Sequence, residues 1–436
     1  MRKTIIVTHD ERNEDGYTMN FYFVLFLLYI IAPKIDLPLI SFPVRPEDII
    51  SLIAVGAFAV LPRRQRLNIS LPIKLYLVFV GANFFAALVN LGSFGLTGIV
   101  YSVRLLQYLV WYFIIYEACH QVTWWTMRRA FLVVSAIFVA WGTLEFSGVI
   151  GVIGKFTGAT ERLTINTSGP FETSVMLAML AYGVSTYLMA GPLLIMVFLT
   201  QSRVTLVGMV FSYFSSRPLR GIVAAALVFL LYSVVVQPIM NSIQDTRIGQ
   251  SEGPQRMVNA FVISWQRAPV LDDPTFFRER LLDGDTIFRY MVDTKGDLSF
   301  RYRAVRWPTL IKTTLNNPLA AVVGWSPGSW GNALDNYYVR VFGETGLLGL
   351  ALFVYWLVVT ILRLDPRGLA RYSLVMMAVV ALFIDIFTSS KCMPLLWAFL
   401  AFEEARHPFA IPQKLRFGLQ LKRPQAALPA PESLSG

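Results

Sequence analysis

Long apolar runs separated by short polar segments repeat along most of the chain. The runs at 20–32, 71–91 and 350–362 are almost free of charged side chains. With their flanks, such runs are long enough to cross a hydrocarbon layer of about 30 Å as α-helices. Aromatic residues stand near the ends of several runs, which is typical of the membrane–water interface. The pattern therefore predicts an all-α polytopic membrane protein.

The number of apolar runs predicts about twelve transmembrane helices. Two short spans that meet at Arg203 are expected within 191–214, because a single long helix there would break the even count of spans between the basic clusters described next. The other expected spans are 20–36, 46–61, 71–91, 98–118, 130–150, 171–189, 221–238, 335–362, 372–389 and 393–404.

Arginine and lysine gather in short segments between the runs, and such clusters stay on the cytoplasmic side of bacterial membranes. The clusters lie at 63–66, 128–129, 217–220, 363–371 and 414–423. An even number of expected spans separates neighbouring clusters, so all of them can be cytoplasmic, together with both termini. We therefore expect a multi-pass protein of the bacterial inner membrane.

One segment between the ninth and tenth spans is hydrophilic and rich in arginine and aspartate, and it falls on the periplasmic side. A long insertion without its own structure would be unusual, so function is expected there. Helical spacing at 305–315 predicts a helix within it. The expected division is 1–19 cytoplasmic, 20–238 transmembrane bundle (spans one to nine), 239–334 large periplasmic loop, 335–404 spans ten to twelve, and 405–436 cytoplasmic and largely disordered tail.

Composition agrees with a membrane protein: 55% of the residues are hydrophobic, 15% are charged, and the mean hydropathy is +0.56. A soluble chain would carry about 25% charged residues. The net charge of +11 fits the cytoplasmic clusters and anionic lipids as partners better than nucleic acid. The two cysteines, Cys119 and Cys392, fall on opposite sides of the expected bundle. Neither a metal nor a cofactor is indicated.

Several arginines fall on the expected periplasmic side, against the usual charge bias. Most of them can balance the acids of the loop. Arg203 is different, because apolar helix flanks it on both sides and an unpaired charge there would be costly and is usually functional. Guanidinium groups bind phosphate with two parallel hydrogen bonds, so these arginines suit a lipid-linked pyrophosphate. The arginines considered are Arg162, Arg203, Arg301, Arg303, Arg306 and Arg340.

Four short stretches resemble motifs of the O-antigen ligase and polymerase superfamily. The most extensive is Asp-Asn-Tyr-Tyr-Val-Arg-Val-Phe-Gly-Glu-Thr-Gly-Leu-Leu-Gly at 335–349, in which an Asp-Asn pair opens a helix and a Glu-x-Gly-Leu-x-Gly step follows. The others are Arg-Ala-Val-Arg-Trp at 303–307 with Asn-Pro-Leu at 317–319 and Gly-Trp at 324–325, Thr-Gln-Ser-Arg at 200–203, and Val-Arg-Pro-Glu-Asp at 44–48. Their order and spacing cover about 40–420 of the chain.

The resemblance implies a GT-C-like, metal-independent glycosyltransferase without a cofactor. Its donor would be a glycan on undecaprenyl pyrophosphate, used at the periplasmic face, and a flippase and a chain-length regulator of the same pathway would be partners. In the ligases that this stretch resembles, a histidine stands at the position of Asp335. The aspartate therefore favours a polymerase of lipid-linked repeat units. An O-antigen ligase acting on lipid A–core and a polysaccharide transporter or flippase are the alternatives.

The same resemblance assigns expected roles. Asp335 would be the base that activates an acceptor hydroxyl, or else the N-cap of the tenth helix. Arg203 and Arg303 would stabilise the leaving pyrophosphate. Glu344 would pair with an arginine or lie on the helix surface, and Trp325 would stack on a sugar or anchor its loop. Further contacts to the pyrophosphate and glycan are expected from Arg162, Arg301, Arg306 and Arg340.

Overall fold

The computed structural model describes a helical protein, and no strand occurs in the part of the chain that it describes. That part comprises residues 20–35, 45–61, 69–119, 122–151, 162–167, 169–184, 187–216, 226, 254–272, 274, 298–331 and 334–406. The expected ninth span at 221–238 and both terminal segments therefore lie almost wholly outside the described residues.

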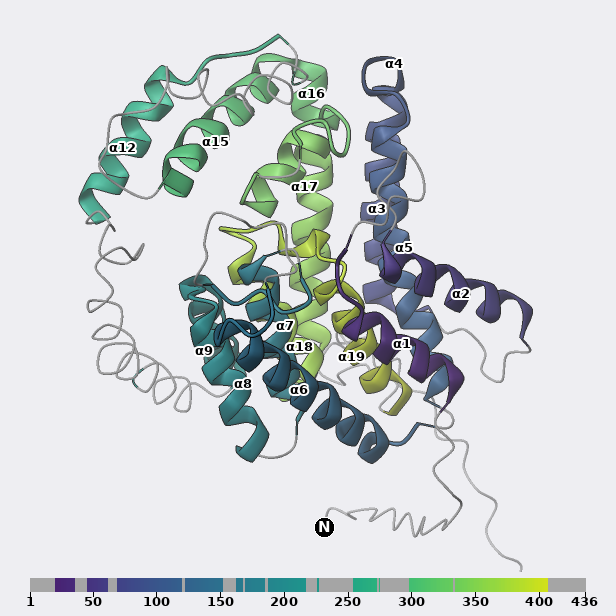
Figure 1. Ribbon diagram of the computed structural model, residues 1–436. Helices are drawn as coiled ribbons and strands as arrows, with labels where there is room; N and C mark the ends of the chain where they lie inside the picture. Colours follow the sequence, from purple (N-terminus) through teal and green to yellow (C-terminus); the bar gives the residue numbers. More distant parts are fainter. Residues whose placement is uncertain are drawn as a thin grey trace, which may run out of the picture.

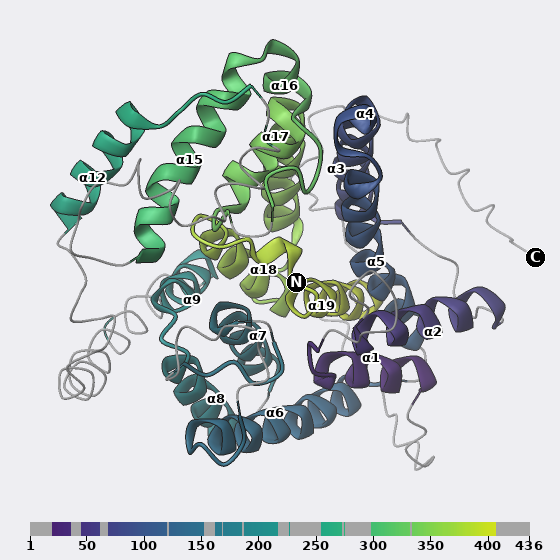
Figure 2. The same cartoon turned by 45° about the horizontal axis from the view of Figure 1, so that its top comes forward.

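Helices make up most of the described residues (Figures 1 and 2). Their bounds are α1 Phe21–Ile31, α2 Pro46–Val60, α3 Leu71–Val89, α4 Leu91–Phe94, α5 Thr97–Ala118, α6 Trp124–Phe146, α7 Pro170–Gly183, α8 Tyr187–Leu199, α9 Arg203–Ser216, α12 Pro254–Arg267, α15 Leu298–Asn316, α16 Pro318–Val323, α17 Tyr337–Arg363, α18 Leu369–Val380, the 3-10 turn η2 Ile386–Thr388, and α19 Cys392–Arg406.

Four of the described helices, α3, α5, α6 and α17, are long and apolar enough to cross a membrane. Three shorter apolar helices accompany them, at Phe21–Ile31, Met189–Leu199 and Leu369–Val380. These helices confirm the prediction of a helical membrane protein, whereas the full count of about twelve spans is not shown.

The start of α6 differs from the expected span, which was placed at 130–150. The helix begins at Trp124, because the Thr123 side chain accepts a hydrogen bond from the Thr126 amide at 3.2 Å. The guanidinium group of Arg128 then lies 4.7 Å from the Trp124 ring. The basic pair expected in a loop is therefore part of the first turns of the helix, where aromatic rings cover it.

Helix α17 is not one straight rod but folds back on itself at Gly346. That glycine has φ +65°, outside the helical region. In a straight helix Tyr337 and Phe353 would be about 24 Å apart along the axis, yet their ring centroids are 5.0 Å apart. The helix therefore consists of a short arm, 337–345, which runs back beside a long arm, 347–363.

The fold-back at Gly346 creates a docking place for the loop that follows α16. Carbonyl groups near the bend are free to accept bonds from outside the helix: Trp325 N donates to Gly343 O and Ser326 N to Glu344 O, both at 3.0 Å. A Cβ on Gly324, which has φ +83°, would lie 2.3 Å from the Glu344 carbonyl. Only glycine allows this close approach of two backbones.

The segment expected as a large loop contains three described helices, which lie together at one end of the molecule beside the bend of α17 (Figure 1). Helix α12 packs on α15, with the rings of Phe261 and Trp307 6.4 Å apart. The Asn317 side chain accepts bonds from two amides at the start of α16. The helix expected at 305–315 is confirmed as part of α15. We call this end of the molecule the α16 side.

Candidate functional site

Several helices begin or end at one region inside the bundle, which we call the helix-end layer. It comprises residues 29–34, 162–167, 169–172, 200–203, 335–340 and 381–391. Helices α7, α9, α17 and α19 start there, and α1, α8 and α18 end there. Because the first amides and the last carbonyls of each helix have no partner within that helix, polar side chains and backbone must satisfy them at this level.

Asp335 lies two residues before the first residue of α17 and pairs with Arg303 of α15. The Nε atom of Arg303 lies 3.2 Å from Asp335 Oδ2, and the side chains are 17% and 36% exposed. The N-cap of α17 is Asn336, whose side chain accepts a hydrogen bond from the Val339 amide at 3.0 Å. The expectation that Asp335 caps the helix is therefore wrong, and its carboxylate is directed to an arginine instead.

Arg340 lies on the short arm of α17, and its side chain contacts groups from three parts of the chain. Its guanidinium group lies 3.2 Å from Asp385 Oδ2 and 3.7 Å from Glu344 Oε1, and it donates to the Gly331 carbonyl at 2.7 Å. The side chain is buried. These contacts suit a positioning role rather than the expected direct contact with substrate, because breaking them would leave two buried acids unbalanced.

Glu344 and Asp385 supply the two acids of this cluster. Glu344 is buried, so the expectation of a surface acid is wrong, and its Oε1 accepts a bond from the Gly328 amide at 2.9 Å. The Asp385 carboxyl is largely buried, and the Arg340 guanidinium beside it balances its charge. The cluster thereby joins the glycine-rich loop 324–331 and the segment 381–391 to the short arm.

A second cluster of buried ion pairs lies farther along the layer and was not expected from the sequence. Lys391 is fully buried, 3.2 Å from Glu47 Oε2. Lys34 lies 2.9 Å from Glu172 Oε2. Ser390 donates to Glu47 at 2.7 Å and Ser389 to Glu172 at 2.6 Å, so one turn of chain binds both acids. The sequence contains one sign of this cluster, because each of its four charged residues stands at the end of an apolar run.

The end of α1 inside the bundle explains part of this cluster. The Nζ atom of Lys391 donates to the carbonyls of Tyr29 and Ala32, at 2.6 and 2.7 Å. The Asn166 amide donates to the Ile30 carbonyl at 2.7 Å and to Ile31 at 3.0 Å. A cation and an amide thus satisfy the last carbonyls of a short helix at a depth where water is scarce.

Arg162 belongs to a loop that Glu145 of α6 holds in place. The Glu145 carboxylate accepts bonds from the amides of Thr164 and Ile165, at 2.7 and 2.8 Å. Arg162 is buried; its Nε donates to the Thr200 carbonyl at 3.0 Å, and its guanidinium lies 4.6 Å from the Phe171 ring centroid. Arg162 therefore lies at the junction of α7, α8 and α9.

Arg203 is the first residue of α9, and its side chain is exposed. The expected break between two short helices at this residue is confirmed. Gln201 has φ +57°, which interrupts the helical path. The hydroxyl of Thr205 lies 2.6 Å from that of Ser174, so the start of α9 is fixed to α7. Arg203 therefore stands at the accessible rim of the helix-end layer.

The remaining expected contacts come from α15 and its neighbouring loop. Arg301 lies on α15, but its side chain lies outside the described residues. Arg306 is half-buried, one turn from Arg303. Trp325 is half-buried and packs against a small apolar cluster, which agrees with the alternative that it anchors its loop; that cluster comprises Leu310, Trp330, Leu334 and Phe342.

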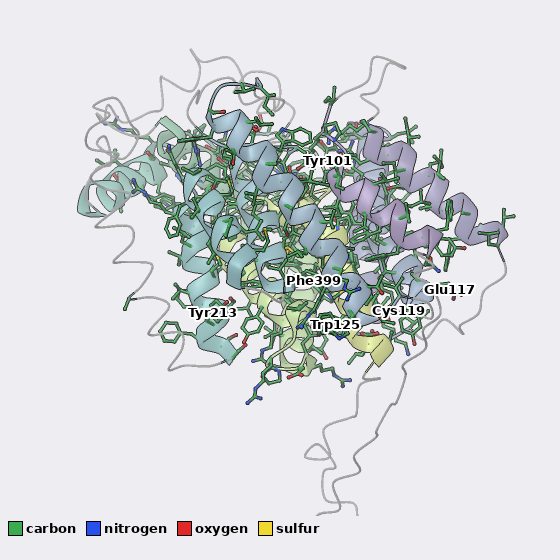
Figure 3. The ribbon with its side chains drawn as sticks, turned by 60° about the horizontal axis from the view of Figure 1, so that its bottom comes forward. Tyr101, Glu117, Cys119, Trp125, Tyr213 and Phe399 are labelled. Carbon is green, nitrogen blue, oxygen red and sulfur yellow. The ribbon has the colours of Figure 1, made fainter. Side chains whose placement is uncertain are left out.

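Helix α5 borders the cluster around Arg340. Tyr101 and Cys119 mark its two ends (Figure 3). A Cβ on Gly328, which has φ +79°, would lie 2.6 Å from the Tyr101 ring, so this end of α5 covers the glycine-rich loop. The Arg104 guanidinium lies 5.9 Å from the same ring. At the other end, Cys119 forms no disulfide, and neither does the buried Cys392.

A continuous chain of contacts joins Arg162 to Arg340. It runs from Arg162 over Phe171 to Glu172, through Ser389 along its segment to Asp385, and on to Arg340. The starts of α7, α9, α17 and α19 bring positive dipole ends to this layer. Arginines beside such helix ends form an environment that stabilises a phosphate-bearing ligand.

Within the described residues, no group of three or more histidine, cysteine or acidic side chains could hold a metal ion. His9, His120 and His407 lie outside those residues. Comparison with protein-family models, curated proteins and solved structures finds no match.

Proposed function

We propose that this protein is a membrane glycosyltransferase that polymerises lipid-linked oligosaccharide repeat units for a bacterial surface or exopolysaccharide. The observation that carries the proposal is the partly exposed Arg303–Asp335 pair, 3.2 Å apart, at the rim of a layer of buried charges and helix starts. A carboxylate beside an arginine combines a proton acceptor with a group that binds phosphate. The resemblance of 335–349 to O-antigen ligases and polymerases supports the same function.

The proposal includes an orientation. The α16 side faces the periplasm, the termini lie in the cytoplasm, and the membrane is the bacterial inner membrane. The described helices would then belong to a GT-C-like bundle of about twelve spans. A flippase that supplies the repeat units, a chain-length regulator and the surrounding lipids are the partners that this placement implies.

In the proposed reaction, Asp335 takes the proton of the acceptor hydroxyl while the oxygen forms a bond with the anomeric carbon of the donor glycan. The bond between that carbon and the pyrophosphate oxygen breaks, and undecaprenyl pyrophosphate leaves with the electron pair. Arg203 and Arg303 stabilise the charge that develops on the leaving group. Arg301 and Arg306 extend the cationic surface around it, and the buried Arg162 adds its positive charge from the junction of α7, α8 and α9.

Arg340 and Glu344 act through other groups in this account. Their ion pair and the Glu344 bond to Gly328 fix the short arm of α17 against the glycine-rich loop. That contact sets the position of Asp335, which lies at the start of the arm. Trp325 anchors the same loop against its apolar cluster, and the exposed part of its ring would support a sugar.

The transferase could instead be an O-antigen ligase, which uses the same donor but the sugar of lipid A–core as acceptor. Residue 335 is an aspartate, whereas the ligases that this stretch resembles have a histidine there. This difference favours the polymerase. A transporter or flippase is a second candidate, and the buried pairs Glu47–Lys391 and Lys34–Glu172 favour it. Ionisable side chains in the interior of a bundle are common along the pathways of transporters.

Replacing Arg203 with alanine tests the transferase. The Arg203→Ala variant should insert normally and lose high-molecular-weight polymer, because the leaving pyrophosphate is no longer stabilised. Arg363→Ala, which removes an exposed arginine at the far end of α17, is the matched control and should keep the polymer. Polymer of unchanged length from Arg203→Ala at equal protein level would contradict the proposal.

A further inference from the structure

Helix α16 presents two different faces. Ala320 and Val323 are buried against its neighbours, whereas Leu319 is 59% and Val322 53% exposed. Leu315, at the end of α15, is exposed as well. An apolar surface of this kind is unfavourable in water and requires a cover.

The sequence around α16 is also unusual for a hydrophilic segment. No charged residue occurs between Lys312 and Asp335. The polar residues near its start have structural tasks: the Asn317 side chain caps the helix by accepting bonds from Leu319 and Ala320. The segment therefore lacks the charges that keep a surface helix in water.

Helix α3 fixes the level of α16 relative to the membrane. As a spanning helix of 19 residues it is about 28 Å long, close to the hydrocarbon thickness. Leu88 and Val89, in its last turn, are exposed and apolar, so lipid must reach that turn. The next residue, Asn90, donates to the Gly324 carbonyl at 3.2 Å. Because Gly324 follows α16 directly, α16 lies at the end of the hydrocarbon layer.

The long arm of α17 also places α16 at the end of the hydrocarbon layer, independently of α3. Leu347 and Leu348, directly after the bend, are exposed on a helix that is apolar enough to span the membrane. A Cβ on Gly346 would lie 2.3 Å from the Val322 carbonyl, so α16 rests on the bend. The exposed apolar surface of α17 therefore continues into α16 without a polar gap.

We propose that residues 315–322 insert into the leaflet on the α16 side, where lipid acyl chains cover Leu315, Leu319 and Val322. Continuity with the lipid-facing surfaces of α3 and α17 identifies acyl chains as the occupant. The segment before α17 thus returns to the bilayer as an interfacial helix, and the glycine-rich loop 324–331 is held at the membrane surface. This inference is independent of the transferase activity.

Fluorescence quenching in reconstituted vesicles tests the insertion. Cys119 is replaced with serine, while Cys392 is retained because it is buried and cannot react. Leu319→Cys and Val322→Cys are labelled with a polarity-sensitive fluorophore in the full-length protein, in vesicles of phosphatidylethanolamine and phosphatidylglycerol. Phe85→Cys, on the exposed face of α3, is the lipid control, and Gln266→Cys, exposed on α12, is the aqueous control.

Acyl chains that carry a doxyl group should quench the labels at 319 and 322 at least half as strongly as the label at 85. Aqueous iodide should quench them several-fold less than the label at 266. Strong quenching by iodide at both positions would overturn the insertion. Protection from both quenchers would also overturn it, since it would show that protein covers α16. If Leu319→Cys inserts poorly, Val322→Cys alone decides between these outcomes.

Discussion

Arg303 lies 3.2 Å from Asp335, and this ion pair joins α15 to the residue before the N-cap of α17. One turn farther along α15, Trp307 donates to the Leu334 carbonyl at 2.7 Å. Two successive contacts therefore fix the chain at the entry to the short arm. Because the neighbouring Asn336 caps the helix, the Asp335 carboxylate is not needed for the first turn of α17.

This division of tasks predicts different effects for two neighbouring substitutions. Asp335→Asn should lower the rate of glycan transfer by about 10²–10⁴-fold, which is the usual contribution of a general base. Its thermal stability in detergent should change little, because the cap is intact. Asn336→Ala should instead lower the free energy of unfolding by about 1 kcal/mol through loss of the cap.

The measurement for this pair is transfer activity together with thermal unfolding of each purified variant. A stable Asp335→Asn protein that retains full activity would remove Asp335 from the mechanism. An Asp335→Asn protein that loses as much stability as Asn336→Ala would show that the aspartate has a structural task instead.

The bend in α17 predicts that even a methyl side chain at position 346 impairs folding. Gly346→Ala should prevent the fold-back or loosen α16, because the new Cβ would lie 2.3 Å from the Val322 carbonyl at a φ that alanine avoids. Gly81→Ala in α3 is the control, since nothing lies within 4 Å of its Cβ position. We expect Gly346→Ala to lower the yield of folded protein in gel filtration and Gly81→Ala to leave it unchanged. Equal yields would contradict the bend.

The buried pair of Lys391 and Glu47 predicts non-additive energetics. Either Lys391→Met or Glu47→Gln should lower the free energy of unfolding by about 3–5 kcal/mol, since each leaves a buried charge without its nearest partner. The double variant should lose less than the sum of the single losses. A double-mutant cycle from unfolding in detergent measures this coupling, and strictly additive losses would show that the two side chains do not interact.

Glu145 predicts an indirect effect on the loop that carries Arg162. Glu145→Gln replaces one carboxylate oxygen with a donor, so the amides of Thr164 and Ile165 can no longer both be satisfied. We expect a loss of about 1–3 kcal/mol in the free energy of unfolding, together with weaker binding of the donor lipid. Thr143→Ser, an exposed change on the same helix, should alter neither quantity. Unchanged stability of Glu145→Gln would contradict the role of Glu145 in holding this loop.

The sequence predicts the membrane helices well where apolar runs have clear ends, as for α3 and α5. It fails at α17, where one apolar run contains a fold-back, since hydropathy cannot distinguish a bend from a continuous span. It also fails after Val380, where an expected span to 389 gives way to the turn around Ile386. There Asp385 and the serines before Lys391 bind distant side chains, so tertiary contacts override the apolar pattern.

For the candidate site, the sequence could identify residues but not partners. Arg340 and Glu344 stand four residues apart on one helix, so their pairing could be expected. The pairing of Glu47 with Lys391 could not, because it joins the two ends of the chain. Likewise, an Asp-Asn pair at 335–336 cannot show which residue caps the helix until the backbone of both is known.

The most direct test of the proposed function is a transfer assay with the purified full-length protein in lipid vesicles and undecaprenyl-pyrophosphate-linked repeat units. The account predicts longer lipid-linked glycans and release of one undecaprenyl pyrophosphate per bond formed, with both lost in Arg203→Ala and Asp335→Asn. Glycans of unchanged length, with the lipid-linked units moved from one leaflet to the other, would contradict it and identify a transporter.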